Sequence, residues 1–261
     1  MQKLAFFDID GTLIPEGQTQ IPKNTLNALH ELMENGILVF VCTGRCYHQA
    51  KHVIDAIGTN NYICSNGQEV CVNGEILYQN TFTPIEVREA VDICERYGVN
   101  WGFETRESLC IPNVKTADAT KKLLEAYNFD NIKIDIDPLS CNIYQFWING
   151  SGAKIGELLE VVVNKSFTYY KWREDLFEIL PGVESKAKGI SIVEEYISGP
   201  KTTYGFGDGV NDLEMMKHVD HSVAMGNALQ VLKDECEYTT TNSEDNGIVN
   251  GLRLVGLLAW Y

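Results

Sequence analysis

The sequence has no long hydrophobic run, no excess of basic charge and no closely paired cysteines. No stretch approaches the roughly 18 apolar residues that a membrane helix needs, and the apolar run at residues 4–7 is too short for a signal-peptide core. The 21 basic and 36 acidic side chains give a formal charge of −15, which argues against nucleic acids and anionic membranes as partners. The eight cysteines include no CxxC pair, so we expect buried thiols in a reducing cytoplasm rather than disulfides or a zinc site.

Alternating strands and helices are expected at both ends of the chain. Short, continuously apolar runs are typical of central parallel strands, and the amphipathic segments between them are typical of crossover helices. We therefore predict an α/β fold with a Rossmann-like parallel-sheet core formed by residues 1–82 and 182–261. The expected core strands are 4–7, 37–42, 62–64, 202–206 and 222–224, and the expected core helices are 22–35, 47–57, 188–197, 211–218 and 248–259.

The middle of the chain, residues 83–181, has a different pattern. Strands that adjoin in sequence indicate an antiparallel sheet, so we predict an inserted α+β domain with its helices on one face. Along the strand expected at 143–148, Gln145 and Trp147 share one side, where they could meet a sugar, and Glu178 on a later strand could reach a hydroxyl. A solvated sheet face explains the same alternation. The expected helices are 85–97, 117–127 and 152–164, and the remaining strands are 167–172 and 176–180.

Acidic side chains follow two of the predicted core strands. Asp8 and Asp10 end the first strand, and Asp208 and Asp212 follow the strand at 202–206 within a glycine-rich turn. Ligands of open α/β sheets bind at the carboxyl ends of the strands, and converging carboxylates repel one another unless a cation is present. Oxygen ligands suit Mg²⁺, so the pattern predicts a magnesium site. A polar strand end and a capped turn are the alternative interpretation.

Two further segments could bind an anion. Thr43, Gly44 and Arg45 end the second core strand, where a hydroxyl and a backbone N–H in a turn favour an anion. We expect the next helix to begin at Lys188, where a cation opposes the helix dipole and calls for an anionic partner. We expect the side chain of Lys186 to be exposed to solvent.

The order of these motifs, DxDGT, TG, Lys-Gly and GDGxND, resembles the haloacid dehalogenase superfamily of phosphatases. The position and size of the insert are similar to the C2 cap of its Cof-type sugar-phosphate phosphatases, and the turn Ser65-Asn66-Gly67 resembles the same subfamily.

The resemblance implies roles for the matching residues. Asp8 would be the nucleophile and Asp10 the general acid/base. The phosphoryl group would be held by the Ile9 and Gly44 backbone N–H groups and by the side chains of Thr43, Lys188 and Asn211. Mg²⁺ would be bound by the Asp8 and Asp208 carboxylates and the Asp10 main-chain carbonyl, with Asp212 behind them. Arg45, Asn66, Trp147 and Glu178 are candidate substrate-binding residues.

The sequence thus predicts a cytoplasmic, Mg²⁺-dependent phosphomonoester hydrolase that acts on small phosphorylated metabolites, sugar phosphates first, through an aspartyl phosphate. Two alternatives stay open. One is a phosphotransferase or sugar phosphomutase that uses the same intermediate, and the other is a phosphoacceptor or sensing module with negligible turnover. The second acid, Asp10, argues against the module, because accepting a phosphate alone needs no general acid.

Overall fold

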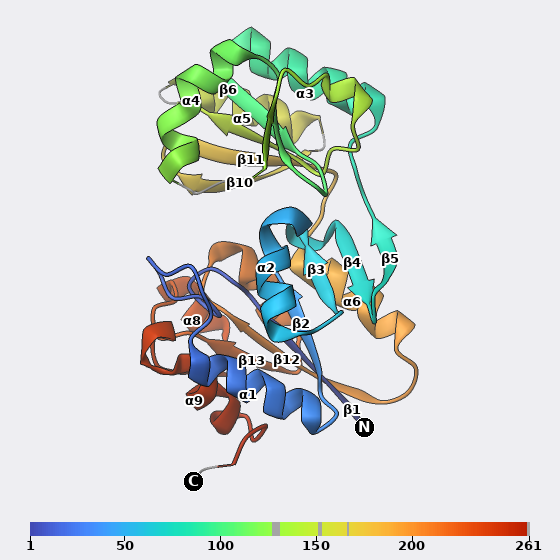
Figure 1. Cartoon of the computed structure of the whole chain (residues 1–261), viewed down its shortest axis with the longest axis vertical. Helices are drawn as coiled ribbons and strands as arrows, with labels where there is room; N and C mark the ends of the chain where they lie inside the picture. Colours follow the sequence, from blue (N-terminus) through green and yellow to red (C-terminus); the bar gives the residue numbers. More distant parts are fainter. Residues whose placement is uncertain (127–130, 151–152, 166, 260–261) are drawn as a thin grey trace. The chain divides into compact units, whose positions relative to one another are not determined.

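The computed structural model describes residues 1–126, 131–150, 153–165 and 167–259, and the chain divides into two compact units (Figure 1). The core unit comprises Met1–Arg45, Ala50–Gln79 and Ser185–Tyr261, and the insert unit comprises Cys46–Gln49 and Asn80–Glu184. Among the described residues, no helix combines the length and the apolar character needed to cross a membrane.

The core unit is built on a mixed sheet with the strand order β14-β13-β12-β1-β2-β3-β4-β5. β1 lies in the middle and pairs in parallel with β12 and β2, while β4 and β5 extend the sheet as an antiparallel hairpin. The parallel α/β core expected from the sequence is confirmed. The strands are β1 (Gln2–Phe7), β2 (Leu38–Cys42), β3 (Tyr62–Cys64), β4 (Glu69–Val72), β5 (Glu75–Gln79), β12 (Lys201–Gly207), β13 (His221–Ala224) and β14 (Tyr238–Thr239).

Helices cover both faces of this sheet. A Cβ added at Gly205 of β12 would meet Met215 of α7 and Val219 just after it, whereas a Cβ added at Gly251 of α9 would meet the ring of Phe206. Consecutive strand residues point to opposite faces, so α7 and α9 lie on opposite sides of the sheet. The helices are α1 (Lys23–Glu34), α2 (Tyr47–Ile57), η1 (Ser65–Gly67), α6 (Lys186–Tyr196), η3 (Val210–Asp212), α7 (Leu213–His218), α8 (Gln230–Glu235), η4 (Ser243–Asp245) and α9 (Gly247–Leu254).

The insert unit has its own sheet, with the strand order β10-β11-β9-β6-β7-β8, antiparallel except for the β7–β8 pair. Phe146 and Ile148 of β9 pack with residues of α3 and α5 in one apolar core. α3 is well delimited, because Thr83 and Glu86 form a capping box at its start and Gly98 ends it in a left-handed conformation. The elements are α3 (Pro84–Tyr97), β6 (Asn100–Glu104), β7 (Leu109–Ile111), α4 (Val114–Ala126), β8 (Ile132–Ile134), η2 (Pro138–Ser140), β9 (Gln145–Asn149), α5 (Ala153–Asn164), β10 (Phe167–Arg173) and β11 (Leu176–Pro181).

The expectation that all helices of the insert lie on one face of its sheet is wrong for α4. Leu124 of α4 packs with Trp147, which points to the side of β9 opposite Phe146 and Ile148. The expected helix ends at Tyr127 and Gly152 lie outside the described residues.

Candidate active site

Three buried or half-buried carboxylates meet at the carboxyl ends of β1 and β12. One oxygen each from Asp8, Asp208 and Asp212 lies within 4.8 Å of the others. The close approach depends on Gly11, because a Cβ there would stand 2.2 Å from an oxygen of Asp208. Thr12 Oγ1 donates to Asp208 Oδ1 over 2.9 Å and fixes that carboxylate. The structure therefore brings these three predicted acids together.

The lysine at this cluster is Lys186, not Lys188. Lys186 is fully buried, and its Nζ lies 2.6 Å from Asp8 Oδ1 and 2.6 Å from Asp212 Oδ1. The exposed Lys188 instead donates to the Tyr78 hydroxyl over 2.9 Å. The expected placement of these two lysines is corrected accordingly.

The position at which α6 begins explains why Lys186, and not Lys188, lies at the cluster. Ser185 is the N-cap of α6 and its hydroxyl accepts from the Lys188 backbone N–H, so that Lys186, and not Lys188, is the first helical residue. Side chains of the first helical turn point back toward the N-terminus of the helix, where the carboxylates lie. Residues two positions apart on a helix point about 200° apart, so only the first of the two lysines faces the carboxylates. The serine was the sequence signal that could have identified the lysine.

Burial is the largest influence on the pKa values of Asp8 and Asp208 in the cluster. Burial raises the pKa of the Asp8 carboxyl well above its ordinary value, an effect that Lys186 offsets only in part. Burial also raises the pKa of Asp208 from 3.8 to about 6, although the Thr12 hydrogen bond acts in the opposite direction. Burial lowers the pKa of Lys186, but Asp212 and Asp8 together raise it by more, so this lysine stays charged.

This charge balance fits a divalent cation. Three carboxylates face one lysine, which leaves two negative charges uncompensated when all the acids are ionised. Asp212 accepts from Lys186 Nζ and from the backbone N–H groups of Asp208 and Gly209, so it supports the site from behind. Asp8 and Asp208 are therefore the carboxylates best placed to hold a metal.

Asp10 follows Asp8 by two residues, and 60% of its side chain is exposed. Arg45 donates two hydrogen bonds to the Asp10 carboxylate, from Nε to Oδ2 at 2.8 Å and from Nη2 to Oδ1 at 2.6 Å. This bidentate pair joins the end of β1 to the turn after β2. Arg45, predicted to bind substrate, is in this structure the partner of the predicted acid/base.

The turn after β3 contacts two other predicted site segments through Asn66. Asn66 is completely buried, its backbone N–H donates to the Thr43 carbonyl, and its Oδ1 accepts from Asn211 Nδ2 over 3.1 Å. Thr43 is itself buried at the end of β2, and its Oγ1 accepts from the Arg45 backbone N–H. Residues from three separate predicted motifs are thus linked by hydrogen bonds within the core unit.

The two candidates in the insert unit differ. Trp147 is 4% exposed and packs with Leu109, Ile111 and Leu124, so its ring is not available as a stacking surface for a sugar. α4 covers this part of the sheet, so a contact of Trp147 with substrate stays a prediction only for its indole N–H. Glu178 is half-buried and accepts from Gln145 Nε2 over 3.3 Å.

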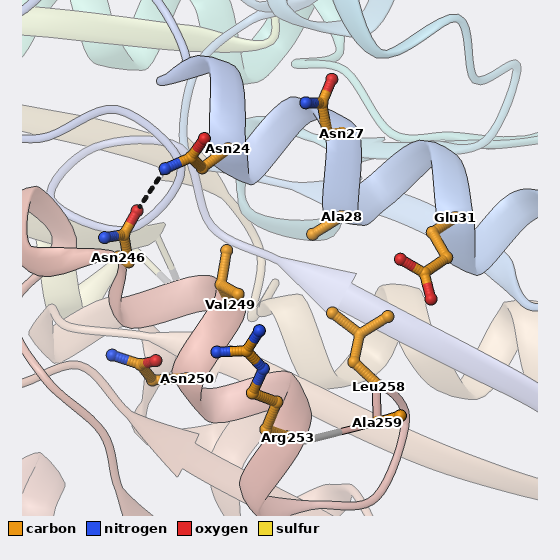
Figure 2. Close-up of a pocket in the computed structure, with 10 residues that line it drawn as sticks. All are labelled: Asn24, Asn27, Ala28, Glu31, Asn246, Val249, Asn250, Arg253, Leu258 and Ala259. Carbon is orange, nitrogen blue, oxygen red and sulfur yellow. Dashed lines mark hydrogen bonds between the residues drawn. The ribbon is translucent and has the colours of Figure 1, made fainter. Parts of the chain in front are cut away.

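A separate hollow of about 300 Å³ lies between α1 and α9 in the core unit (Figure 2). Polar groups from both helices line it, and Asn24 Nδ2 donates to Asn246 Oδ1 over 3.0 Å. None of the described carboxylates of the aspartate cluster belongs to its lining, so it is distinct from the candidate active site.

Comparisons with known proteins show which family the chain belongs to. The family of haloacid dehalogenase-like hydrolases matches residues 5–252. YkrA of Bacillus subtilis, a provisionally named phosphatase, is 29% identical over 98% of both chains. The HMP-PP phosphatase of Yersinia pseudotuberculosis is 30% identical over 90% of this chain and 88% of its own.

Solved structures show the same relationship. A protein of Geobacillus kaustophilus has a TM-score of 0.89 at 29% identity and covers 99% of this chain and all of its own. The HAD subclass IIB sugar phosphatase BT4131 has a TM-score of 0.81 at 26% identity, with 99% and 100% of the two chains covered. The chain therefore belongs to the haloacid dehalogenase-like hydrolases, and it is a phosphatase of that family.

Proposed function

We propose that this phosphatase is a Mg²⁺-dependent phosphomonoester hydrolase that works through an aspartyl phosphate on Asp8. The observation that carries the proposal is the contact of Asp8 with the buried Lys186 beside Asp208 and Asp212. A carboxylate and a phosphate repel each other, so a nucleophilic carboxylate needs a nearby cation. Lys186 is positioned to offset this repulsion while an oxygen of Asp8 keeps a lone pair for the attack.

The Asp8 and Asp208 carboxylates and the Asp10 main-chain carbonyl would hold the magnesium ion. The charge balance of the aspartate cluster supports this donor set, because two negative charges are uncompensated there. When bound, Mg²⁺ would neutralise charge on the phosphoryl oxygens.

The protein groups supply the remaining chemistry. An oxygen of Asp8 attacks phosphorus and displaces the leaving alkoxide, while the Asp10 carboxyl donates a proton to the oxygen of the leaving alkoxide. Asp10 then takes a proton from the water that attacks the aspartyl phosphate, and inorganic phosphate leaves. This role requires Asp10 to exchange its bidentate contact with Arg45 for the reacting groups during turnover.

The phosphoryl group would be held by groups from several turns of the core unit. We assign this role to the Ile9 and Gly44 backbone N–H groups and to the side chains of Thr43, Lys186 and Asn211. Asn66 supports Asn211 through the hydrogen bond between their amides, which favours a shared position at the substrate.

The proposed substrates are small phosphorylated metabolites in the cytoplasm, sugar phosphates first, with neither nucleic acid nor membrane as partner. The net charge of −15 supports the exclusion of polyanionic partners. The names of two relatives, a sugar phosphatase and an HMP-PP phosphatase, support small phosphorylated substrates. We propose residues 83–181 as the cap domain that selects among them, with Glu178 as one contact.

The first test is phosphate release from a panel of sugar, nucleotide and small organic phosphates, together with p-nitrophenyl phosphate. We expect release with Mg²⁺, loss of release with a chelator, and at least a 1,000-fold lower rate in Asp8→Asn, whose fold should be unchanged. Isomerised sugar phosphate without free phosphate would indicate a mutase instead. A stable phosphoprotein with no turnover would indicate a sensing module.

A further inference from the structure

A buried polar cluster lies on one face of the insert unit's sheet, on neighbouring strands. Glu104 of β6 is directly opposite Gln145 of β9, and Glu178 lies on β11, the strand on the other side of β9. Gln145 Nε2 lies 3.4 Å from an oxygen of Glu104 and 3.3 Å from an oxygen of Glu178. Gln145 is 0% exposed and Glu104 is 2% exposed. Glu104 Oε2 also lies 3.1 Å from His48 Nε2, within the same unit.

Gln145 Oε1 and Trp147 Nε1, both on this face, have no hydrogen-bond partner among the described residues. Gln145 Oε1 is a buried acceptor without a donor, although the amide nitrogen of the same side chain contacts both carboxylates. Trp147 Nε1 is a buried donor without an acceptor, on the same side of β9 as Gln145. Its indole lies over Gly102, where a Cβ would stand 2.5 Å from Nε1.

Such a network is costly if its only purpose is structural. A buried polar atom without a partner loses its hydration and gains nothing in return, and a partly satisfied network is less favourable than an apolar core. The opposite side of β9 shows that the unit can build such a core, because Phe146 and Ile148 pack there among apolar residues. The unsatisfied atoms are therefore better explained by a ligand that completes them.

The chemistry of the two atoms selects the ligand. An ammonium group could satisfy Gln145 Oε1 but not Trp147 Nε1, because it has no lone pair to accept with. A carboxylate or a second phosphate could accept from Trp147 Nε1, but it would meet the carboxylates of Glu104 and Glu178. Hydroxyl groups both donate and accept, so a neutral polyhydroxylated group can satisfy both atoms.

We propose that Gln145 Oε1 and Trp147 Nε1 form a hydroxyl-recognition site for the sugar part of the substrate. This inference rests on the proposed phosphatase reaction and adds its specificity-determining residues. The Trp147 ring stays a packing element under α4, and only its N–H takes part. Glu104 orients the Gln145 amide by accepting from Nε2, which leaves Oε1 to accept from the ligand.

The test compares hexose 6-phosphates with their monodeoxy analogues as substrates of the full-length protein. We expect kcat/KM of the wild-type protein to fall about tenfold or more for at least one deoxy analogue, because the analogue leaves a buried polar atom unpaired. Gln145→Leu removes the acceptor and should bring the ratio for that analogue close to one. Trp147→Phe keeps the aromatic bulk, removes the donor, and should abolish discrimination at the same or a neighbouring hydroxyl.

The matched control is Asn149→Leu, on the same side of β9, whose amide already donates to the Asp175 carbonyl over 3.0 Å. This variant should discriminate like the wild type. Discrimination that survives in both Gln145→Leu and Trp147→Phe, or that is absent from the wild type, would overturn the inference while leaving the phosphatase reaction in place. No Asp8-dependent release from any ester, p-nitrophenyl phosphate included, would overturn both. Because Trp147→Phe is conservative, the test stands even if Gln145→Leu does not fold.

Discussion

At the scale of single residues, the choice between two lysines decides how the site works. Lys186 and Lys188 are two positions apart, but only Lys186 is enclosed by carboxylates, and only its charge compensates Asp8. A buried lysine remains protonated when the attraction of nearby acids exceeds the cost of desolvation, as it does here.

Replacing these lysines one at a time should separate their roles. Lys186→Ala should lower kcat by about 100-fold to 1,000-fold, because a buried positive charge is lost beside the nucleophile. Lys188→Ala should change kcat by less than about threefold, since its contact with Tyr78 lies at the surface. The measurement is steady-state phosphate release, with circular dichroism to verify the fold at the assay temperature. Equal losses in both variants would contradict the assignment of Lys186.

At the scale of elements, the turn Ser65–Gly67 and the start of α6 are fitted closely together. Gly67 has a φ of +101°, and a Cβ there would stand 2.1 Å from the Ser185 carbonyl oxygen. Ser185 caps the helix that begins with Lys186, so the fit of this glycine helps to place the lysine. Backbone packs on backbone here, so neither partner can move aside cheaply.

Gly67→Ala should therefore reduce both stability and activity. We expect the free energy of unfolding to fall by about 2–4 kcal/mol, from left-handed strain plus overpacking, with a parallel loss of kcat. Gly17→Ala is the matched control, because Gly17 also has a positive φ, +77°, but has no neighbour within 4 Å of an added Cβ. It should lose only about 1 kcal/mol and retain its activity. Denaturant unfolding of both variants measures the difference, and similar losses would argue against the close fit.

At the scale of the whole molecule, an acidic chain places part of its negative charge in a site that a cation can neutralise. The chain carries a formal charge of −15, and three of its 36 acidic side chains form the described aspartate cluster. Protons and divalent cations should therefore compete for this site, and both should stabilise the fold.

The pKa of Asp208, raised from 3.8 to about 6, predicts the sign of the pH dependence. Between these two values the folded protein binds more protons than the unfolded chain, so this group destabilises the metal-free protein above pH 6. The destabilisation, up to about 3 kcal/mol, is relieved as the pH falls through 6 toward 4. A bound cation relieves the same repulsion without a proton. Mg²⁺ should therefore raise the melting temperature more at pH 7.5 than at pH 5.

Thermal unfolding with and without Mg²⁺ at the two pH values measures this difference. Asp208→Asn removes the titrating group and a metal ligand together, so its melting temperature should respond little to Mg²⁺ at either pH. An equal Mg²⁺ effect at pH 5 and pH 7.5 in the wild type would contradict the link between Asp208 and the metal.

Much of the fold follows from local patterns. Apolar runs, helical periodicity and the position of Asp8 at a strand end depend on neighbours along the chain, and the parallel core and the family follow from them. The failures concern distant contacts. The burial of Trp147 depends on α4 lying on the second face of the sheet, which alternation within β9 does not reveal.

The sequence by itself determined the α/β core, the family and the acids that converge on its strand ends, because each of these depends on the order and spacing of residues. Only the tertiary structure decided that Lys186 pairs with Asp8 and that Arg45 pairs with Asp10. It also decided that Gln145 is buried between two carboxylates. The physical reason is that burial and pairing are properties of positions in space. Two lysines of the same helical turn have nearly the same sequence context, but one lies buried among carboxylates and the other lies at the surface beside Tyr78.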